Sequence, residues 1–487
     1  MTPHGTPIRG RIGLLLGPAL FALLLLLPRP DGLPVEGQRV AAVAVLMATW
    51  WMTEALPLAA TALLPIVLFP ALGVLSAGES TAPYANHLIF LFLGGFFLAA
   101  SLQRWGLHRR IALSVVAVVG TGARTVVRGF MLATAFLSAW ISNTATTVMM
   151  LPIATAILGL LEEDETGPLG TPLMLGIAYA ASIGGIATLI GTPPNAVFAA
   201  AAEELLGRTI GFLEWMYVGV PVAVIMLGIT WWLLVHVLHP LPGGSSAAVA
   251  TKTVVRRERA ALGRMARGEW TTAIVAALTA LAWVLREPKE IGAGTMPGIA
   301  TYLPQAADST IAVAGALLLF SIPVSLERGE FALDWETARR IPWGILLLFG
   351  GGLSLARAFD VSGLAAWIGD RVTLFGALPT IGLVAVVAVV FLLLTELTSN
   401  TATATMGMPL MAGVAAGVGT DPLPLMATAA LASSMAFMLP VATPPNAIVF
   451  GSGRVTIAQM ARAGLWLNLI GAALISLVAY GLVVAVF

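Results

Sequence analysis

The chain has 487 residues, of which 58% are apolar and only 10% are charged, with a formal net charge of +1. A soluble domain carries about 25% charged residues. This composition therefore excludes a water-facing globular protein and predicts a surface that mostly faces lipid. The absence of cysteine excludes disulfides, thiolate metal sites and cysteine nucleophiles.

Apolar runs near the length needed to cross a bilayer, roughly 20 residues, follow one another along the chain. Eleven are expected to be full crossings: 11–27, 37–55, 57–75, 86–104, 171–201, 213–238, 269–286, 308–325, 341–358, 422–450 and 463–487. Two further apolar stretches, 128–160 and 378–413, are each interrupted at the centre by small polar residues. Each is either one kinked crossing or a re-entrant helical hairpin.

The placement of Lys and Arg decides between these alternatives. With both interrupted stretches re-entrant and a cytoplasmic N-terminus, 18 of the 25 Lys and Arg lie inside and 7 outside. Two full crossings would instead place the basic loop 241–268 outside, against the positive-inside rule. We therefore expect a multi-pass protein of the cell membrane (the inner membrane in a bacterium), with two hairpins and its C-terminus outside.

Three motifs recur in order, at offsets of 257, 257 and 251 residues. The pairs are 94–99 with 351–356, 142–146 with 399–403, and 192–196 with 443–447. In the predicted topology the first copy enters the membrane from inside and the second from outside. Such inverted repeats are typical of transporters that bind their substrate near the membrane midplane. The expected fold is thus an all-α polytopic membrane protein with an inverted repeat.

The second pair of motifs places Ser-Asn-Thr triplets, 142–144 and 399–401, in the middle of the two hairpins. Irregular backbone at membrane depth is tolerated where it is buried in protein or lines a wet cavity. A helix that begins at a hairpin tip presents free N–H groups, which favour an anion. Hydroxyl, carboxamide and carbonyl oxygens favour a hard cation such as sodium. The alternative is that these side chains only join packed helices.

The third pair consists of Thr-Pro-Pro-Asn motifs, 192–195 and 443–446, each inside a long apolar segment. Two adjacent prolines remove two backbone donors and break a helix. A simple proline kink is the alternative. If each hairpin tip pairs with the broken helix of its own half, two cation pockets flank one anion site.

None of these four segments contains a charged residue, although Glu396 lies just before the second triplet. A dianion would therefore be met by dipoles, neutral oxygens and bound cations, and sodium would offset the cost of bringing the dianion into the cell. Glu396 and Glu54 either titrate, as in a proton-coupled transporter, or form a structural pair with an arginine. We expect structural pairing for both.

These paired motifs, together with the Trp-x-Thr-Glu-Ala-Leu-Pro stretch at 51–57, resemble the divalent anion/sodium symporters, which carry dicarboxylates, citrate and sulfate. The resemblance implies a homodimer, a scaffold domain, and a transport domain that moves as an elevator. It implies this division: scaffold helices 1–4 with an interfacial helix in 1–121, the first hairpin and helices 5–6 in 122–240, a cytoplasmic linker in 241–268, scaffold helices 7–9 in 269–377, and the second hairpin and helices 10–11 in 378–487.

The resemblance also implies which residues bind. One sodium would be held by Ser138, Ser142, Asn143 and Gly191, and the other by Thr395, Thr398, Asn400 and Ala442. The substrate carboxylates would meet Ser142, Asn143, Thr144, Ser399, Asn400 and Thr401, with Thr192, Pro193, Thr443 and Pro444 nearby.

The predicted function is import of a C4-dicarboxylate such as succinate, malate or fumarate, coupled to Na⁺. Two alternatives keep the fold: dicarboxylate exchange without net sodium coupling, and sodium-coupled transport of sulfate or citrate. An intramembrane enzyme is disfavoured because no His or Lys accompanies the serines of the tips, and a channel is disfavoured by the paired hairpins. The expected partners are the substrate, sodium ions, the lipid bilayer and a second copy of the chain. No nucleic acid is expected as a partner.

Overall fold

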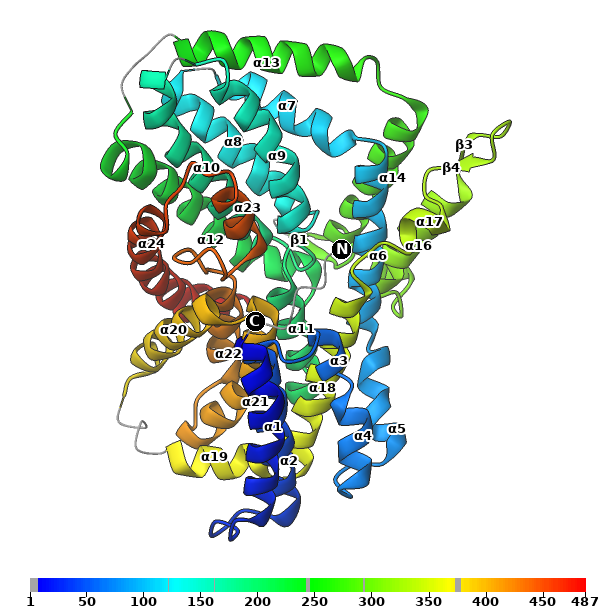
Figure 1. Ribbon diagram of the computed structural model, residues 1–487. Coiled ribbons are helices and arrows are strands. Elements are labelled where there is room, and N and C mark those ends of the chain that lie inside the picture. Colours follow the sequence, from blue (N-terminus) through cyan, green and yellow to red (C-terminus); the bar gives the residue numbers. More distant parts are fainter. Residues whose placement is uncertain (1–7, 121, 162, 242–245, 292–293, 373–377) are drawn as a thin grey trace.

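The computed structural model describes residues 8–120, 122–161, 163–241, 246–291, 294–372 and 378–487, and nearly all of its regular structure is helical (Figure 1). Part of the predicted linker, 242–245, and part of the predicted segment 269–377, namely 373–377, lie outside the described residues.

The first half of the chain forms a series of helices that ends at the linker helix α13. Their bounds are α1 Ile8–Leu26, α2 Val35–Thr53, α3 Leu58–Thr61, α4 Leu64–Ala71, α5 Ala77–Thr81, η1 Ala82–Ala85, α6 His87–Arg104, α7 Leu107–Val119, α8 Ala123–Ser138, α9 Asn143–Leu158, α10 Glu163–Gly185, α11 Pro193–Leu206, α12 Phe212–Trp232, η2 Leu233–Leu238 and α13 Ser246–Leu262.

The second half repeats much of this order. Its elements are α14 Arg267–Val284, β1 Lys289–Ile291, β2 Gly294–Met296, α15 Ile299–Tyr302, α16 Asp308–Ser321, β3 Pro323–Ser325, β4 Glu330–Phe331, α17 Trp335–Ala338, α18 Trp343–Val361, α19 Leu364–Val372, α20 Thr380–Leu397, α21 Asn400–Val418, α22 Pro422–Ser433, α23 Pro444–Phe450, α24 Ile457–Val478, η4 Ala479–Val483 and α25 Val484–Val486. The strands form two short antiparallel hairpins, β1 with β2 and β3 with β4, within connecting segments.

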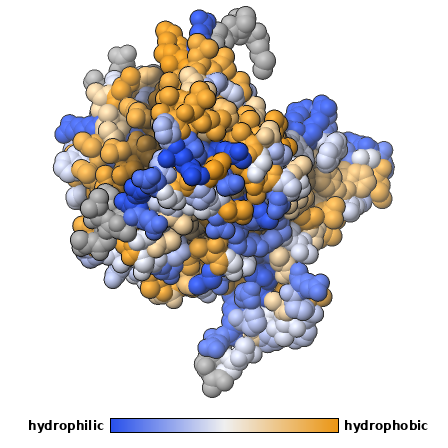
Figure 2. Space-filling model, turned by 90° about the horizontal axis from the view of Figure 1, so that it is seen from below, coloured by the Kyte–Doolittle hydropathy of each residue, from blue (hydrophilic) through white to orange (hydrophobic). Residues whose placement is uncertain are grey.

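Seven of the described helices are long and apolar enough to cross a membrane. They are Ile8–Leu26, Ala77–Arg104, Phe212–Leu238, Trp343–Val361, Thr380–Leu397, Asn400–Val418 and Ile457–Val486. The apolar surface agrees with this, since Figure 2 shows broad hydrophobic areas on the face seen from below. The protein is therefore an all-α multi-helix membrane protein, and the count of eleven crossings stays a prediction.

One expected crossing differs from the structure. The segment 57–75 was predicted as a single crossing, but it forms the short helices α3 and α4 instead of one long helix. Pro57 stands at the N-cap of α3 and Pro65 in the first turn of α4. Proline is favoured at the start of a helix, whereas in the interior it removes a backbone hydrogen bond. The two prolines thus divide the apolar segment 57–75 into two helices, whereas hydropathy alone predicts one.

The repeat is visible in how the long helices α6 and α18 end. Each is followed by a glycine in the left-handed region, Gly106 with φ 71° and Gly363 with φ 72°. Glycine adopts this conformation without the Cβ clash that other residues suffer. The chain turns at both glycines into the shorter helices α7 and α19, which lie at opposite ends of the molecule in Figure 1. Helix α19 therefore follows α18 in the second half as α7 follows α6 in the first.

Ion pairs occur at both ends of the long helices. Near α13 they join α6, α7, α13, α14 and the start of α17, and at the opposite ends they join α6, α11, α16, α18 and the end of α14. The first set is Arg104–Asp334, Arg109–Glu258 and Arg110–Glu269, and the second is His87–Glu203, Arg286–Asp308 and Arg357–Glu204. Charged side chains therefore pair at the ends of these helices rather than in the middle of their apolar stretches.

Helix α8, the first helix of the predicted hairpin 128–160, packs so closely against α10 that the two backbones are in contact. A Cβ placed on Gly184 would lie 2.3 Å from the carbonyl oxygen of Ala135 and 2.4 Å from its Cα. Replacement of Gly184 by Val is therefore expected to prevent folding, because neither backbone can move without separating the two helices. Gly228→Val on α12 is the matched control, since a Cβ there meets nothing within 4 Å. Monodisperse yield in detergent measures both, and equal yields would contradict the prediction.

Candidate ion and substrate site

The first hairpin tip is formed where α8 ends and α9 begins. The Ser142 hydroxyl caps α9 by accepting a hydrogen bond from the Ala145 N–H at 3.3 Å. The Ser138 hydroxyl lies 2.6 Å from Asn143 Oδ1 and 2.6 Å from the carbonyl oxygen of Ala181 on α10. Three oxygens thus converge with one hydroxyl proton between them. This is a ligand set that suits a small hard cation, because oxygen ligands are what such cations prefer.

The second tip, between α20 and α21, repeats this arrangement. The Thr395 hydroxyl lies 2.7 Å from Asn400 Oδ1 and 2.7 Å from the carbonyl oxygen of Ser433 at the end of α22. Thr395 and Asn400 stand 257 residues after their counterparts Ser138 and Asn143. Both clusters are neutral and both combine a hydroxyl, a carboxamide and a main-chain carbonyl. Two equivalent oxygen clusters are therefore present, one in each half.

The broken helices bring a further loop to each tip. Between α10 and α11, the loop after Gly185 returns so closely that a Cβ on Gly191 would lie 2.4 Å from the Gly185 carbonyl oxygen. A Cβ on Gly185 would itself lie 2.7 Å from Asn143 Oδ1 and 3.2 Å from the Gly191 carbonyl oxygen. Gly191 thus lies beside the first oxygen cluster, as the predicted sodium set requires. A side chain at Gly185 would fill the space between them.

Asn195 and Asn446, the last residues of the Thr-Pro-Pro-Asn motifs, hold these loops in place. Asn195 Nδ2 donates to the carbonyl oxygens of Gly185 at 3.1 Å, Ile186 at 3.2 Å and Thr188 at 2.7 Å. Asn446 Nδ2 donates to the carbonyl oxygens of two loop residues, both at 3.1 Å, namely Ala436 and Leu439. Both asparagines are fully buried. The sequence motif was recognised, but this bracing of the loops was not predicted.

Two predicted sodium ligands in the second half, Thr398 and Ala442, take no part in the hydrogen bonds of the cluster. The Thr398 hydroxyl donates to the Leu394 carbonyl oxygen at 2.8 Å and lies 2.5 Å from Thr403 Oγ1. Its side chain is therefore occupied within the hairpin, so its backbone carbonyl is the group left for a ligand role. Ala442 is buried in the loop before α23, 7% exposed.

The predicted substrate residues differ in exposure between the halves. Ser142 and Thr144 are exposed, whereas Ser399 is half-buried and Thr401 is buried. The others are placed as follows: Asn143, Pro193 and Asn400 are half-buried, Thr192 and Thr443 are buried, and Pro444 is exposed. The first tip is therefore more open to its surroundings than the second.

The half-helices connect the two halves. Helix α11 packs against α21 and α22 of the second half, and α23 packs against α9 and α10 of the first half. In Figure 1, α23 accordingly lies beside α9 and α10. Each half-helix thus starts beside the tip of its own half and runs along the hairpin of the other. The two oxygen clusters are thus connected through the half-helices α11 and α23.

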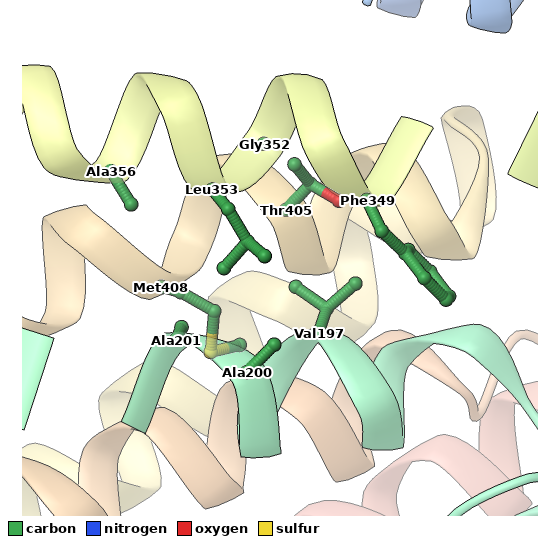
Figure 3. Close-up of a pocket in the computed structure, with 9 residues that line it drawn as sticks. All are labelled: Val197, Ala200, Ala201, Phe349, Gly352, Leu353, Ala356, Thr405 and Met408. Carbon is green, nitrogen blue, oxygen red and sulfur yellow. The ribbon is translucent and has the colours of Figure 1, made fainter. Parts of the chain in front are cut away.

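A small apolar cavity lies beside this region but contains none of the predicted binding residues. It lies between α11, α18 and α21 and has a volume of about 10 Å³, room for one water molecule at most. Figure 3 shows its lining, which includes Val197, Phe349, Leu353, Thr405 and Met408. It is too small and too apolar to hold a dicarboxylate.

The arginine pairing that was expected for two acidic residues is found for one of them, Glu54, and not for Glu396. Glu54 makes an ion pair with Arg9 at 2.5 Å. Glu396 is buried and binds backbone N–H groups of the loop before α23 instead of an arginine.

The main-chain oxygens of Ala181 and Ser433 were not predicted, because every residue has a carbonyl and no side-chain pattern marks the ones that bind.

Comparison with known proteins agrees with the fold. The model of the sodium:sulfate symporter transmembrane region matches residues 11–487. The sodium-dependent dicarboxylate transporter SdcS of Staphylococcus saprophyticus is 43% identical over 97% of this chain and 91% of its own length. SdcS of Staphylococcus aureus is 44% identical over 96% and 90%, respectively. The solved YdaH transporter of Alcanivorax borkumensis is 16% identical, with a TM-score of 0.59 over 96% of this chain and 98% of that one, and so is similar in fold alone.

The fold and the comparisons together define a membrane transporter and not an enzyme. The chain belongs to the sodium:sulfate symporter family. The family expected from the repeated motifs is thereby confirmed.

Proposed function

We propose that this protein imports C4-dicarboxylates such as succinate, malate and fumarate together with Na⁺. The observation that carries the proposal is the duplicated oxygen cluster, Ser138 with Asn143 and Thr395 with Asn400. The two relatives named above, at 43% and 44% identity over nearly the whole chain, are named sodium-dependent dicarboxylate transporters. Both halves also keep a complete Ser-Asn-Thr triplet.

In this proposal each half binds one sodium ion and the halves share one substrate. The first ion is held by Ser138, Ser142, Asn143 and Gly191, and the second by Thr395, Thr398, Asn400 and Ala442. The first turns of α9 and α21 present free N–H groups and the positive end of the helix dipole, which attract carboxylates. Bound sodium adds the positive charge that the neutral side chains lack, so substrate and ions bind together more tightly than either alone.

Serine, asparagine and threonine at 142–144 and 399–401 would bind the two carboxylates from opposite sides. Thr192, Pro193, Thr443 and Pro444, at the starts of α11 and α23, would border the same space. A dicarboxylate fits this arrangement because it carries one anionic group for each tip. Neutral donors also discriminate little among dianions of similar length, so succinate, malate and fumarate would bind at the same site.

The movement and assembly of the protein follow the family resemblance. We propose that α8–α12 and α20–α24 move together as an elevator against a scaffold of the remaining helices, in a homodimer. A hydrophobic cluster that contains Val40, Trp51, Phe69, Leu348 and Leu355 joins α2 and α4 to α18, and it also contains Ala402 of the moving helix α21. Movement of this kind would break the contacts of α11 with α6 and α18, where His87 pairs with Glu203 and Arg357 with Glu204.

For the orientation, we propose a cytoplasmic N-terminus, an external C-terminus and two re-entrant hairpins. The support is the distribution of Lys and Arg, 18 inside against 7 outside in this topology. The basic helix α13 then lies at the cytoplasmic surface.

Uptake of radiolabelled succinate into proteoliposomes tests the proposal. An inward Na⁺ gradient is expected to drive accumulation above the external concentration, and replacement of Na⁺ by K⁺ is expected to reduce uptake to the level of empty liposomes. Uptake that ignores Na⁺ but requires internal dicarboxylate would identify an exchanger instead. Competition by excess sulfate or citrate, with no competition by fumarate, would identify the other substrate class.

A further inference from the structure

Glu396 is a buried carboxylate in the second half that the proposed transport cycle does not use. It stands on α20, 4% exposed. Its Oε1 accepts hydrogen bonds from the N–H groups of Phe437 at 2.7 Å and Met438 at 2.9 Å, and from Asn468 Nδ2 at 2.7 Å. Its Oε2 accepts from the N–H groups of Met438 at 3.0 Å and Leu439 at 3.2 Å.

Four of these five bonds come from backbone N–H groups, which can only donate, and the fifth comes from the amide of Asn468. A protonated carboxyl group would have to place its own proton against an N–H, whereas an ionised one accepts all of these bonds. Three successive backbone N–H groups form a concave anion-binding arrangement, in which a carboxylate is the natural occupant. The geometry therefore fits the charged form of Glu396.

The loop that Glu396 binds is also held from its other sides. A Cβ on Gly464 of α24 would lie 2.5 Å from the backbone of Phe437, so helix and loop are in direct contact. The ring of Tyr179 on α10 packs edge-on against that of Phe437, at 5.2 Å between centroids. The carbonyl oxygens of the same loop, at Ala436 and Leu439, accept from Asn446. Glu396 thus fixes a loop that lies immediately behind the second oxygen cluster.

The first half joins the equivalent positions with neutral groups. The residue 257 positions before Glu396 is Ala139, and the residue 251 positions before Leu439 is Thr188. The Thr188 hydroxyl donates to the Ala139 carbonyl oxygen at 2.5 Å. In both halves the loop therefore donates a hydrogen bond to the residue at this point of the hairpin. Only in the second half is the acceptor charged.

We propose that Glu396 is a positioning residue that makes the two sodium pockets unequal. Its carboxylate holds the loop before α23 in place and puts a fixed negative charge on the residue that follows Thr395, a ligand of the second pocket. The second pocket then binds sodium tightly before substrate arrives. The first pocket, with Ala139 at this position, depends on the substrate carboxylates for its negative charge. This inference rests on the sodium-coupled function proposed above.

The size of the effect follows from electrostatics. Two unit charges about 10 Å apart in protein surroundings interact strongly enough to change a binding constant by roughly tenfold. The carboxylate is already bonded to N–H groups, which spread its charge without cancelling it. Removal of the charge should therefore weaken sodium binding at the second pocket by about this factor.

Three variants of the full-length protein in proteoliposomes test the inference, with uptake of succinate measured against Na⁺ concentration. E396Q keeps the size of the side chain and loses the charge, E396D keeps the charge, and T188V removes the neutral bond of the first half. E396Q is expected to raise the Na⁺ concentration for half-maximal uptake by about tenfold, while the KM for succinate at saturating Na⁺ changes less than twofold. E396D and T188V are expected to keep the wild-type Na⁺ dependence, although the maximal rate falls.

Several results would overturn the inference while leaving the sodium-coupled function intact. One is an E396Q variant with the Na⁺ dependence of the wild type, and another is an E396D or T188V variant with the same shift as E396Q. If E396Q does not fold, a second measurement replaces the uptake assay of that variant. It is the rise in melting temperature with Na⁺, measured without substrate for purified E396D and T188V. An equal loss of that rise in both would contradict the inference. Wild-type uptake without sodium dependence would instead refute the proposed function itself.

Discussion

Replacement of Asn143 by Ala is expected to abolish sodium-coupled succinate uptake, and replacement of Asn400 by Ala is expected to do the same. Each carboxamide oxygen lies 2.6 or 2.7 Å from the hydroxyl of its own cluster, Ser138 or Thr395. Loss of one contact to a charged group costs roughly 2–3 kcal/mol, or about a hundredfold in sodium affinity. Because substrate and both ions bind together, the loss at one pocket is transmitted to the whole complex.

Asn86→Ala is the matched control for these two variants. Asn86 also accepts a hydrogen bond at a helix N-terminus, from the Leu88 N–H at 2.8 Å, but it stands at the start of α6 and outside both clusters. Its loss costs about 1 kcal/mol of stability at a helix cap and is expected to leave succinate uptake near the wild-type rate. Normal uptake by both N143A and N400A, at wild-type amounts of folded protein, would rule out the assigned pockets.

The largest effect on stability is expected where Asn195 or Asn446 is replaced by Leu. Each side chain is fully buried and donates to two or three loop carbonyls, which would lose their partners and stay away from water. A buried polar group left without a partner costs about 1–3 kcal/mol, so each variant should lose roughly 2–4 kcal/mol. The melting temperature in detergent measures this loss, and it should fall in both variants.

Thr155→Val serves as the control for that experiment. The Thr155 hydroxyl bonds only to the Leu151 carbonyl oxygen of its own helix at 2.9 Å, and the side chain is exposed. Its replacement is expected to leave the melting temperature unchanged. A melting temperature of N195L or N446L equal to that of T155V would show that the carboxamides do not brace the loops.

The sequence predicted best the features that the same side chains form in both halves of the chain. The triplets at 142–144 and 399–401 and the proline pairs at 193–194 and 444–445 each occupy the same place in both halves of the structure. Hydropathy found the long helices for the same reason, since lipid demands an apolar side chain at nearly every position. The prediction that each tip lies beside the broken helix of its own half agrees with the bonds of Ser138 and Thr395.

Features made by the backbone were beyond the reach of the sequence. Ala181 and Ser433 contribute carbonyl oxygens to the clusters, and nothing in an apolar helix distinguishes those two carbonyls from their neighbours. The N–H groups that bind Glu396 depend on the shape of a loop, which is set by contacts from three helices. The division of 57–75 into two helices was missed because hydropathy outweighed the prolines.

The central claim is that neutral oxygens in two equivalent clusters bind sodium and a dicarboxylate together. The melting temperature of the purified protein, titrated with succinate in Na⁺ and in K⁺, tests it most directly, because a ligand that binds only the folded state raises that temperature. A rise with succinate in Na⁺ and none in K⁺ is the predicted result. An equal rise in both salts, or no rise in Na⁺, would contradict the claim.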